Sequence, residues 1–150
     1  MEFTQGAPFD SFGLSEATMR AIRNKHYTVS TPVQAGCIPP MLAGKDAIAK
    51  APTGTGKTFA FGIPIIEHID PESEEVQAVI LAPTRELAMQ ITDEMRDIAV
   101  CHEGVRLVCL YGGQPIGKQI DALKRRPQIV VATPGRLMDH YKHHSIDISH

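Results

Sequence analysis

Residues 51–58 read Ala-Pro-Thr-Gly-Thr-Gly-Lys-Thr, and this stretch decides which fold the chain can form. An apolar run at 46–51 leads into it and an amphipathic run at 59–66 follows, which predicts a strand, a glycine-rich turn and a helix. Glycines let backbone N–H groups converge on phosphate oxygens, where a Cβ atom would block the approach. The following helix would direct the positive end of its dipole at the same phosphates. The stretch therefore predicts a site for a nucleoside triphosphate.

Two side chains at the end of this stretch have the chemistry that such a site needs. Lys57 would reach the β- and γ-phosphates as a point charge, and the Thr58 hydroxyl would ligate Mg²⁺. The general pattern for these loops begins with glycine, whereas Ala51 stands there in this chain. The core Gly-x-Gly-Lys-Thr at 54–58 is intact, so nucleotide binding is favoured over the alternative of a chance glycine-rich turn.

Size and composition are those of one ordinary globular domain. The chain has 150 residues, of which 43% are hydrophobic and 21% are charged. The first residues have neither the basic start nor the apolar segment of a signal peptide, and no apolar run is long enough to predict a membrane span. Three cysteines without a Cys-x-x-Cys spacing fit a reducing compartment, so we expect a cytoplasmic protein.

The distribution of charge is uneven, although the net charge is only −2. Residues 101–150 hold seven Lys or Arg residues and four Asp or Glu residues. A solvated surface is enough to explain this imbalance, so it does not by itself predict binding to nucleic acid.

An alternation of strands and helices predicts an open parallel α/β sheet, with ligands at the carboxyl ends of the strands. The apolar patterns place strands at 46–50, 77–82, 106–110 and 128–132, and helices at 57–68, 85–100, 115–125 and 135–143. The runs at 79–82 and 129–132 are continuously apolar, as expected of strands covered on both faces. Upstream, we expect helices at 14–26 and from Thr31, the second one broken or kinked by Pro39 and Pro40.

Each of the later predicted strands ends in a polar or glycine-bearing turn. These turns lie at 83–86, 111–114 and 133–136, and two of them place an arginine, Arg85 or Arg136, in the first turn of a helix. Arginine near the positive end of a helix dipole is unfavourable unless an anion binds there. The set predicts contacts with the phosphates of a single nucleic-acid strand, the alternative being turns that are merely well capped.

In this order the motifs resemble those of the first RecA-like domain of a DEAD-box RNA helicase. Residues 51–58 match motif I of that family, including its usual alanine at the first position, and residues 27–34 resemble its Q motif. Residues 83–87 match motif Ia, residues 112–113 the GG motif and residues 133–136 motif Ib. The resemblance runs from Phe9 to about residue 143, and it is specific because five motifs occur in the right order.

The resemblance implies a three-layer open parallel sheet, an incomplete RecA-like P-loop NTPase domain that spans residues 1–150, with a Q-motif region at 9–34. It implies an ATP-dependent RNA helicase that uses ATP or ADP with Mg²⁺ and binds the RNA backbone without sequence preference. Gln34 would pair with the edge of adenine. The implied nucleotide-binding residues are Phe9, Tyr27, Gln34, Thr53, Gly54, Thr55, Gly56, Lys57 and Thr58, among which Lys57 and Thr58 are catalytic and Thr58 holds the metal. The implied RNA-binding residues are Pro83, Thr84, Arg85, Gly112, Gly113, Thr133, Pro134, Gly135 and Arg136.

Two departures from the family pattern shape the expectations. His26 replaces the glycine that normally precedes the Q-motif aromatic, which predicts a local loop change. The chain also stops before the Asp-Glu-Ala-Asp strand, so the rest of the first domain and the second RecA-like domain are expected elsewhere. We expect this stretch alone to lack efficient hydrolysis. Because a sheet edge would stay unpaired, we also expect it either to be less than the whole folding unit or to pair with another copy.

Other interpretations are a binding module without catalysis, or a different P-loop enzyme such as a DNA helicase or a small-molecule kinase. Gln34 argues against the second of these. The histidines show no metal-binding pattern, and although His140 and His144 have helical i, i+4 spacing, we expect both at the surface.

Overall fold

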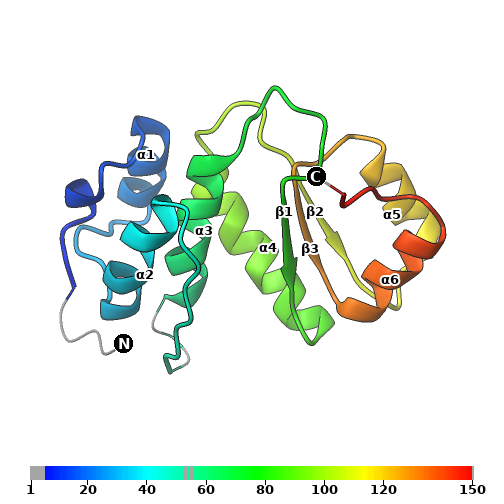
Figure 1. Cartoon of the computed structure of the whole chain (residues 1–150), viewed down its shortest axis with the longest axis horizontal. Helices are drawn as coiled ribbons and strands as arrows, with labels where there is room; N and C mark the ends of the chain where they lie inside the picture. The colour runs from blue at the N-terminus through cyan, green and yellow to red at the C-terminus, as the bar shows by residue number, and fades with distance from the viewer. Residues whose placement is uncertain (1–5, 53, 55, 150) are drawn as a thin grey trace. The chain divides into compact units, whose positions relative to one another are not determined.

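The computed structural model describes residues 6–52, 54 and 56–149, and its chain divides into two compact units (Figure 1). The first unit comprises residues 1–68 and 97–102, and the second comprises 69–96 and 103–150. The helices of the first unit are a 3₁₀ helix at Phe9–Phe12, α1 (Glu16–Asn24), α2 (Pro32–Leu42) and α3 (Lys57–His68). The second unit carries β1 (Ala78–Leu81), β2 (Leu107–Leu110), α5 (Ile116–Leu123), β3 (Ile129–Ala132) and α6 (Pro134–Lys142), while α4 (Arg85–Ala99) contributes to both units.

The helices of the first unit begin within two residues of the positions that the sequence predicts. The Ser15 side chain accepts from the Thr18 N–H and caps α1, and Pro32 occupies the first turn of α2, where a missing N–H costs nothing. The helix α2 packs against α3, and Val33, Cys37 and Ala60 form a small buried cluster. This pair of helices positions the glycine-rich loop, because the loop leads directly into α3.

Pro39 and Pro40 do not break the second helix, although the helix ends before Gly44 as the sequence predicts. The helix α2 runs through Pro39 and Pro40 and ends at Leu42. The prolines lie in its last turns, so few backbone hydrogen bonds are lost, and the buried side chains of Cys37 and Ile38 hold the preceding turn.

A parallel sheet with the strand order β1-β3-β2 forms the centre of the second unit. In register, Val130 of β3 lies beside Val79 of β1 on one side and Val108 of β2 on the other. The helix α4 covers one face of the sheet, and α5 and α6 cover the other (Figure 1). The predicted three-layer architecture is confirmed in this unit.

The central and outer strands of the sheet differ in burial. All four residues of β3 are fully buried, and each large apolar side chain there contributes about 1.5–3 kcal/mol by leaving water. In β1, by contrast, Val79 is 39% exposed and Leu81 is 56% exposed. The expectation that both faces of β1 are covered is wrong, because Val79 and Leu81 lie on the same face of the strand and both are exposed.

The strand predicted at 46–50 does not form. Residues 46–51 adopt neither strand nor helix, and the side chain of Ile48 is 96% exposed. A strand is stabilised by ladder hydrogen bonds to a neighbour, and no described strand pairs with this segment. The other predicted strands and helices occur within two residues of their expected bounds, and the helix predicted at 14–26 is two residues shorter at each end. Within the described residues, no helix is both long and apolar enough to cross a membrane.

Candidate functional site

The glycine-rich loop has the backbone conformation that the sequence predicts. Gly54 has φ of +82° and Gly56 has φ of +79°, in the left-handed region that favours glycine. The residues between and before them, Thr53 and Thr55, were predicted to bind nucleotide but lie outside the described residues. The loop ends at the first residue of α3, whose first turn holds no acidic side chain. The positive end of this helix is therefore available to an anion.

Lys57 and Thr58 occupy the first two positions of α3. Lys57 is exposed to solvent and Thr58 is half-buried. An exposed cation and a hydroxyl at the start of a helix, after a loop with two left-handed glycines, form a donor set that fits a triphosphate and its Mg²⁺. Among the described residues, no cluster of three His, Cys, Asp or Glu side chains offers another metal site.

Gln34 links the start of α2 to the glycine-rich loop. The Oε1 atom of Gln34 accepts from the Thr31 backbone N–H at 2.9 Å. The backbone N–H of Gln34 donates to the Thr31 hydroxyl at 3.4 Å, which completes a capping box. Its Nε2 donates to the carbonyl of Gly56 at 3.1 Å. Among the described residues, these side-chain bonds use one of the two amide N–H groups and one of the two oxygen lone pairs, which leaves a donor and an acceptor. A Cβ atom at Gly56 would lie 2.3 Å from Nε2, so this glycine is also required for close approach.

The two aromatic residues predicted to lie near the base differ in exposure. Phe9 is 1% exposed and packs edge-on against Phe12, with the ring centroids 6.1 Å apart. Tyr27 is 44% exposed and stands edge-on to Phe59, with a centroid distance of 5.7 Å. Stacking of Phe9 on a base stays a prediction, and Tyr27 is the one of the two that is open to a ligand.

The turn after β1 presents Arg85 to solvent. Pro83 and Thr84 are exposed, and the Thr84 hydroxyl accepts from the Leu87 N–H at 3.2 Å, which caps α4. The Arg85 side chain is 52% exposed, and its only described ion pair is a loose one with Glu86 at 3.8 Å. Its guanidinium lies 5.8 Å from the centre of the Tyr111 ring, within cation–π range. Arg85 can therefore bind a phosphate without giving up a strong partner.

The Gly-Gly turn lies against the same arginine. Gly112 and Gly113 are exposed, and Gly113 has φ of +90°. A Cβ atom at Gly113 would lie 3.2 Å from Nη1 of Arg85. Within the described residues, neither glycine N–H has a hydrogen-bond partner, so both can donate to a ligand.

The turn after β3 holds the second arginine differently. Thr133 has the backbone of an N-cap residue, yet its hydroxyl makes no capping bond, and the exposed Pro134 and Gly135 follow it. The side chain of Arg136 is only 14% exposed. Its Nη1 donates to the carbonyl of Gln114 at 3.0 Å and to Oε1 of Gln119 at 3.4 Å. Its Nε lies 3.6 Å from the Asp139 carboxylate, too far for a hydrogen bond, and is otherwise unpartnered.

The expectation that His140 is a surface residue is wrong, while His144 is exposed as expected. The His140 side chain is fully buried in α6, with its ring nitrogens 2.9 Å from Gln119 Oε1 and 2.7 Å from Ser145 Oγ. Burial lowers the pKa of His140, and the Arg136 guanidinium lowers it further. Sequence reasoning missed both His140 and Gln119, although each lies one helical turn from an apolar position, at Leu137 and Leu123, and this spacing could have indicated burial.

The family model of the DEAD/DEAH box helicases matches residues 31–150. The chain belongs to the DEAD/DEAH box helicase family. It is 48% identical over 141 residues to the DEAD-box ATP-dependent RNA helicase CshA of Bacillus subtilis, covering 94% of this chain and 28% of that relative. It is 45% identical over 141 residues to the ATP-dependent RNA helicase DeaD of Escherichia coli, covering 94% of this chain and 22% of the relative.

Solved structures agree with this membership. The crystal structure of a DEAD box protein from Methanococcus jannaschii matches with a TM-score of 0.87 and 39% identity, covering 94% of this chain and 38% of that one. The RecA-like fold predicted from the sequence is thereby confirmed, and a helicase is favoured over a small-molecule kinase. The chain spans about a quarter of the length of the curated relatives that it matches.

Proposed function

We propose that this chain is the ATP-binding and RNA-binding first part of an ATP-dependent RNA helicase. The observation that carries the proposal is the Gln34 amide, which bonds to the glycine-rich loop and keeps one donor and one acceptor. Adenine offers a complementary acceptor and donor along one edge, whereas guanine offers two acceptors at the corresponding positions. An ATP-dependent enzyme has to select adenine nucleotides over guanine nucleotides.

Lys57 and Thr58 would hold the β- and γ-phosphates and Mg²⁺, while Gly54 and Gly56 supply backbone N–H groups. When bound, Mg²⁺ neutralises charge that develops on the transferred phosphoryl group. The exposed Lys57 side chain orients the phosphates as a point charge. The bond between Gln34 and Gly56 holds the base-reading and phosphate-reading residues at a fixed separation.

The adenine preference can be measured by calorimetric titration of the 150-residue chain with ADP and GDP. We expect ADP to bind more tightly, and Gln34→Ala to remove the difference by deleting the side chain that distinguishes the bases. Lys57→Ala should weaken both ligands without changing their ratio, because it affects only the phosphates. Equal affinities of the wild-type chain for ADP and GDP would refute adenine recognition by Gln34.

RNA would bind along the turns of the second unit through its phosphates and 2′-hydroxyls. Arg85, the exposed turn of Gly112 and Gly113, whose N–H groups have no partner among the described residues, and the start of α6 at Thr133 all offer donors. None of these groups distinguishes one base from another, so binding would be independent of sequence.

We further propose that the chain is the N-terminal portion of a longer cytoplasmic enzyme, and that a second RecA-like domain completes the site for hydrolysis. The relatives are about four times longer, which supports this arrangement. Phosphoryl transfer requires water-positioning and charge-neutralising groups in addition to Lys57 and Thr58. Residues 1–150 alone would then bind nucleotide and RNA without efficient hydrolysis.

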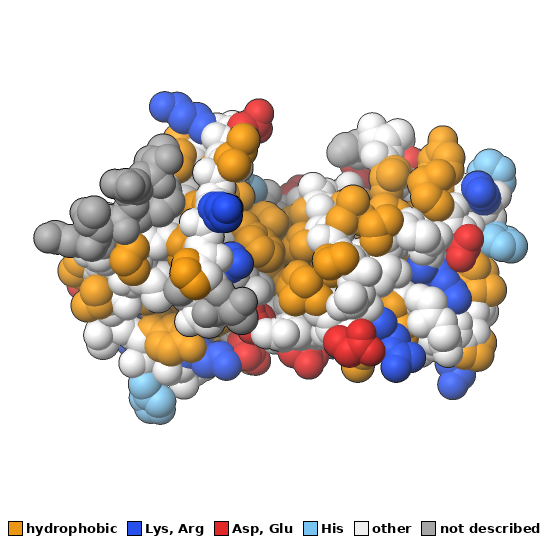
Figure 2. Space-filling model, turned by 90° about the horizontal axis from the view of Figure 1, so that it is seen from below, with side chains coloured by type: hydrophobic (Ala, Val, Ile, Leu, Met, Phe, Trp, Pro, Cys, Tyr) orange, Lys and Arg blue, Asp and Glu red, His pale blue; other side chains and the backbone are white. Residues whose placement is uncertain are grey.

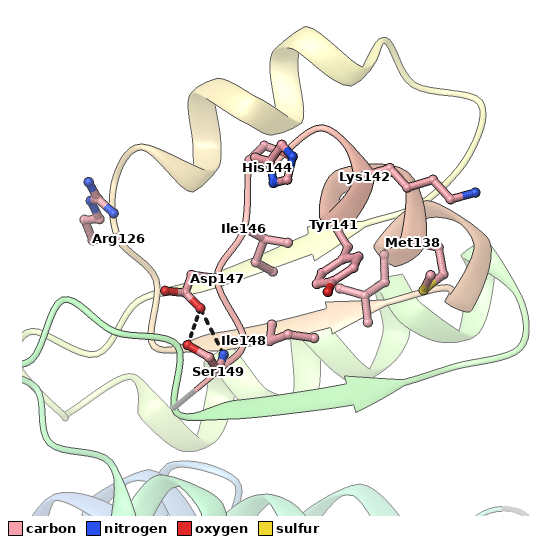
Figure 3. Close-up of a pocket in the computed structure, with 11 residues that line it drawn as sticks. Arg126, Met138, Tyr141, Lys142, His144, Ile146, Asp147, Ile148 and Ser149 are labelled. Atoms are coloured by element: carbon pink, nitrogen blue, oxygen red, sulfur yellow. Dashed lines mark hydrogen bonds between the residues drawn. The ribbon is translucent and has the colours of Figure 1, made fainter.

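Exposed apolar surface leads us to expect self-association of the 150-residue chain. Orange side chains reach the surface of the second unit in Figure 2. On β1, Val79 and Leu81 are exposed. Figure 3 shows Met138, Tyr141 and Ile148 around a cavity of about 860 Å³ beside α6, which includes none of the predicted binding residues. Such patches and open strand edges favour association. Light scattering after size exclusion should give a mass above 16.4 kDa, and a stable monomer would contradict the expectation.

A further inference from the structure

One buried side chain, Gln119 of α5, bonds to two of the three turns that we propose for RNA binding, at 111–114 and 133–136, and reaches the third through Tyr111. It is 2% exposed. Its Nε2 donates to the carbonyl of Tyr111 at 2.8 Å and to Oε1 of Gln114 at 2.9 Å, on the two sides of the Gly-Gly turn. Its Oε1 accepts from Arg136 at 3.4 Å and from His140 at 2.9 Å. The first of these partners, Tyr111, also carries the Arg85 guanidinium above its ring.

The hydrogen-bond chemistry fixes the orientation of every group in this cluster. A guanidinium can only donate, so the Gln119 atom that faces Arg136 must be the oxygen. The nitrogen of Gln119 then faces the Tyr111 carbonyl and an oxygen of Gln114. Because His140 Nε2 also faces the Gln119 oxygen, that ring nitrogen must carry the proton.

The other ring nitrogen of His140 can then accept from the Ser145 hydroxyl, 2.7 Å away. All four hydrogen-bonding positions of the Gln119 amide are therefore used, which prevents the amide from flipping. A fully bonded buried amide holds its partners in one arrangement, whereas an apolar side chain of the same size would let them move.

We infer that Gln119 is a positioning residue for RNA binding, and that His140 orients it. It holds the ends of the Gly-Gly turn, so that the exposed N–H groups of Gly112 and Gly113 face the ligand. It also fixes Arg136 at the start of α6 and Tyr111 beneath Arg85. The inference rests on the proposed function, since it names how the proposed RNA site is assembled, while Gln119 itself is too deeply buried to touch the strand.

The test compares RNA affinities of variants of the full-length protein, measured by fluorescence anisotropy with a nonhydrolysable ATP analogue. Gln119→Met keeps the size of the side chain and removes four hydrogen bonds, and we expect RNA to bind about 10-fold more weakly. Affinity for the ATP analogue alone should not change. The matched control, Asp121→Met, puts the same residue at an exposed position of α5, where only an exposed ion pair with Lys124 is lost, and should bind RNA as the wild type does.

A pair of variants at His140 tests the inference if Gln119→Met does not fold. His140→Gln retains an N–H that can reach the Gln119 oxygen and should bind RNA normally. His140→Leu removes the donor and should weaken binding in the same direction as Gln119→Met. RNA affinities within twofold of the wild type for folded Gln119→Met, or for His140→Leu when Gln119→Met is unfolded, would overturn the inference.

The amide signals of Gly112 and Gly113 in NMR spectra separate this inference from the proposed function. If Gln119 positions the turn, both signals should shift and exchange faster with solvent in the Gln119→Met variant, even without RNA. Wild-type protein that bound no RNA would refute the proposed function, yet the glycine signals would still report on the positioning. Unchanged glycine signals in the folded variant would overturn the positioning role.

Discussion

Replacing Lys57 with alanine is expected to lower ATP hydrolysis by the full-length protein about 100-fold to 1,000-fold, the usual cost of losing one group that stabilises transition-state charge. Lys57 is the first residue of α3, and its exposed ammonium lies at the positive end of that helix. Its removal leaves the developing charge on the phosphates without its nearest side-chain cation. The rate of phosphate release under saturating RNA measures the effect.

The matched control for this experiment is Lys50→Ala. Lys50 is exposed like Lys57, but it lies in the extended segment before the loop. Both variants change the net charge by the same amount, so a difference between them reports position and not overall charge. A Lys57→Ala enzyme that hydrolysed ATP at more than a third of the wild-type rate would exclude a catalytic role for this lysine.

Alanine variants of the two arginines in the proposed RNA site are expected to differ in melting temperature, although both should bind RNA more weakly. Arg85→Ala should weaken RNA binding about 10-fold, equally for all sequences, and reduce the salt dependence by roughly one phosphate contact. Arg136→Ala should weaken binding at least as much and also lower the melting temperature, because Gln114 and Gln119 lose a buried donor. Binding at several salt concentrations and thermal unfolding of the same samples separate the two effects.

For each arginine, one experimental result would contradict the role that we assign to it. A loss of affinity by Arg85→Ala that is confined to certain RNA sequences would mean that this residue reads bases. An unchanged melting temperature for Arg136→Ala would mean that its contacts to Gln114 and Gln119 do not stabilise the fold. Arg23→Ala is a suitable control, since Glu16, exposed on the same helix of the first unit, is the one described ion-pair partner of Arg23.

Local patterns in the sequence predict most of the helices and the parallel sheet, because those patterns depend on nearby residues. The predicted bounds 57–68 of the helix after the glycine-rich loop agree with α3. The strand predicted at 46–50 fails for the opposite reason, since a strand depends on a neighbour that local sequence does not specify. The prolines of α2 show that burial of neighbouring side chains can outweigh a local preference.

Motifs also predict the exposed parts of the site better than its buried supports. Arg85 and Gly113 lie in turns whose residue types predict ligand binding. The structure places the Arg85 guanidinium beside Gly113. Gln119 and His140 are polar residues on amphipathic helices, where polarity normally indicates the solvent side. Only the three-dimensional contacts identify them as buried partners of the turns.

The bonds of Gln34 connect base recognition with the local stability of two helices. The same amide closes the capping box at the start of α2 and bonds to the residue that precedes α3. A base that bonds to the remaining donor and acceptor would hold the Gln34 side chain in place. The starts of both helices bond to this side chain, so base binding would stabilise both of them. Nucleotide should therefore slow hydrogen exchange at the amino ends of α2 and α3 together. Local unfolding of these two helix ends would then depend on which base is bound.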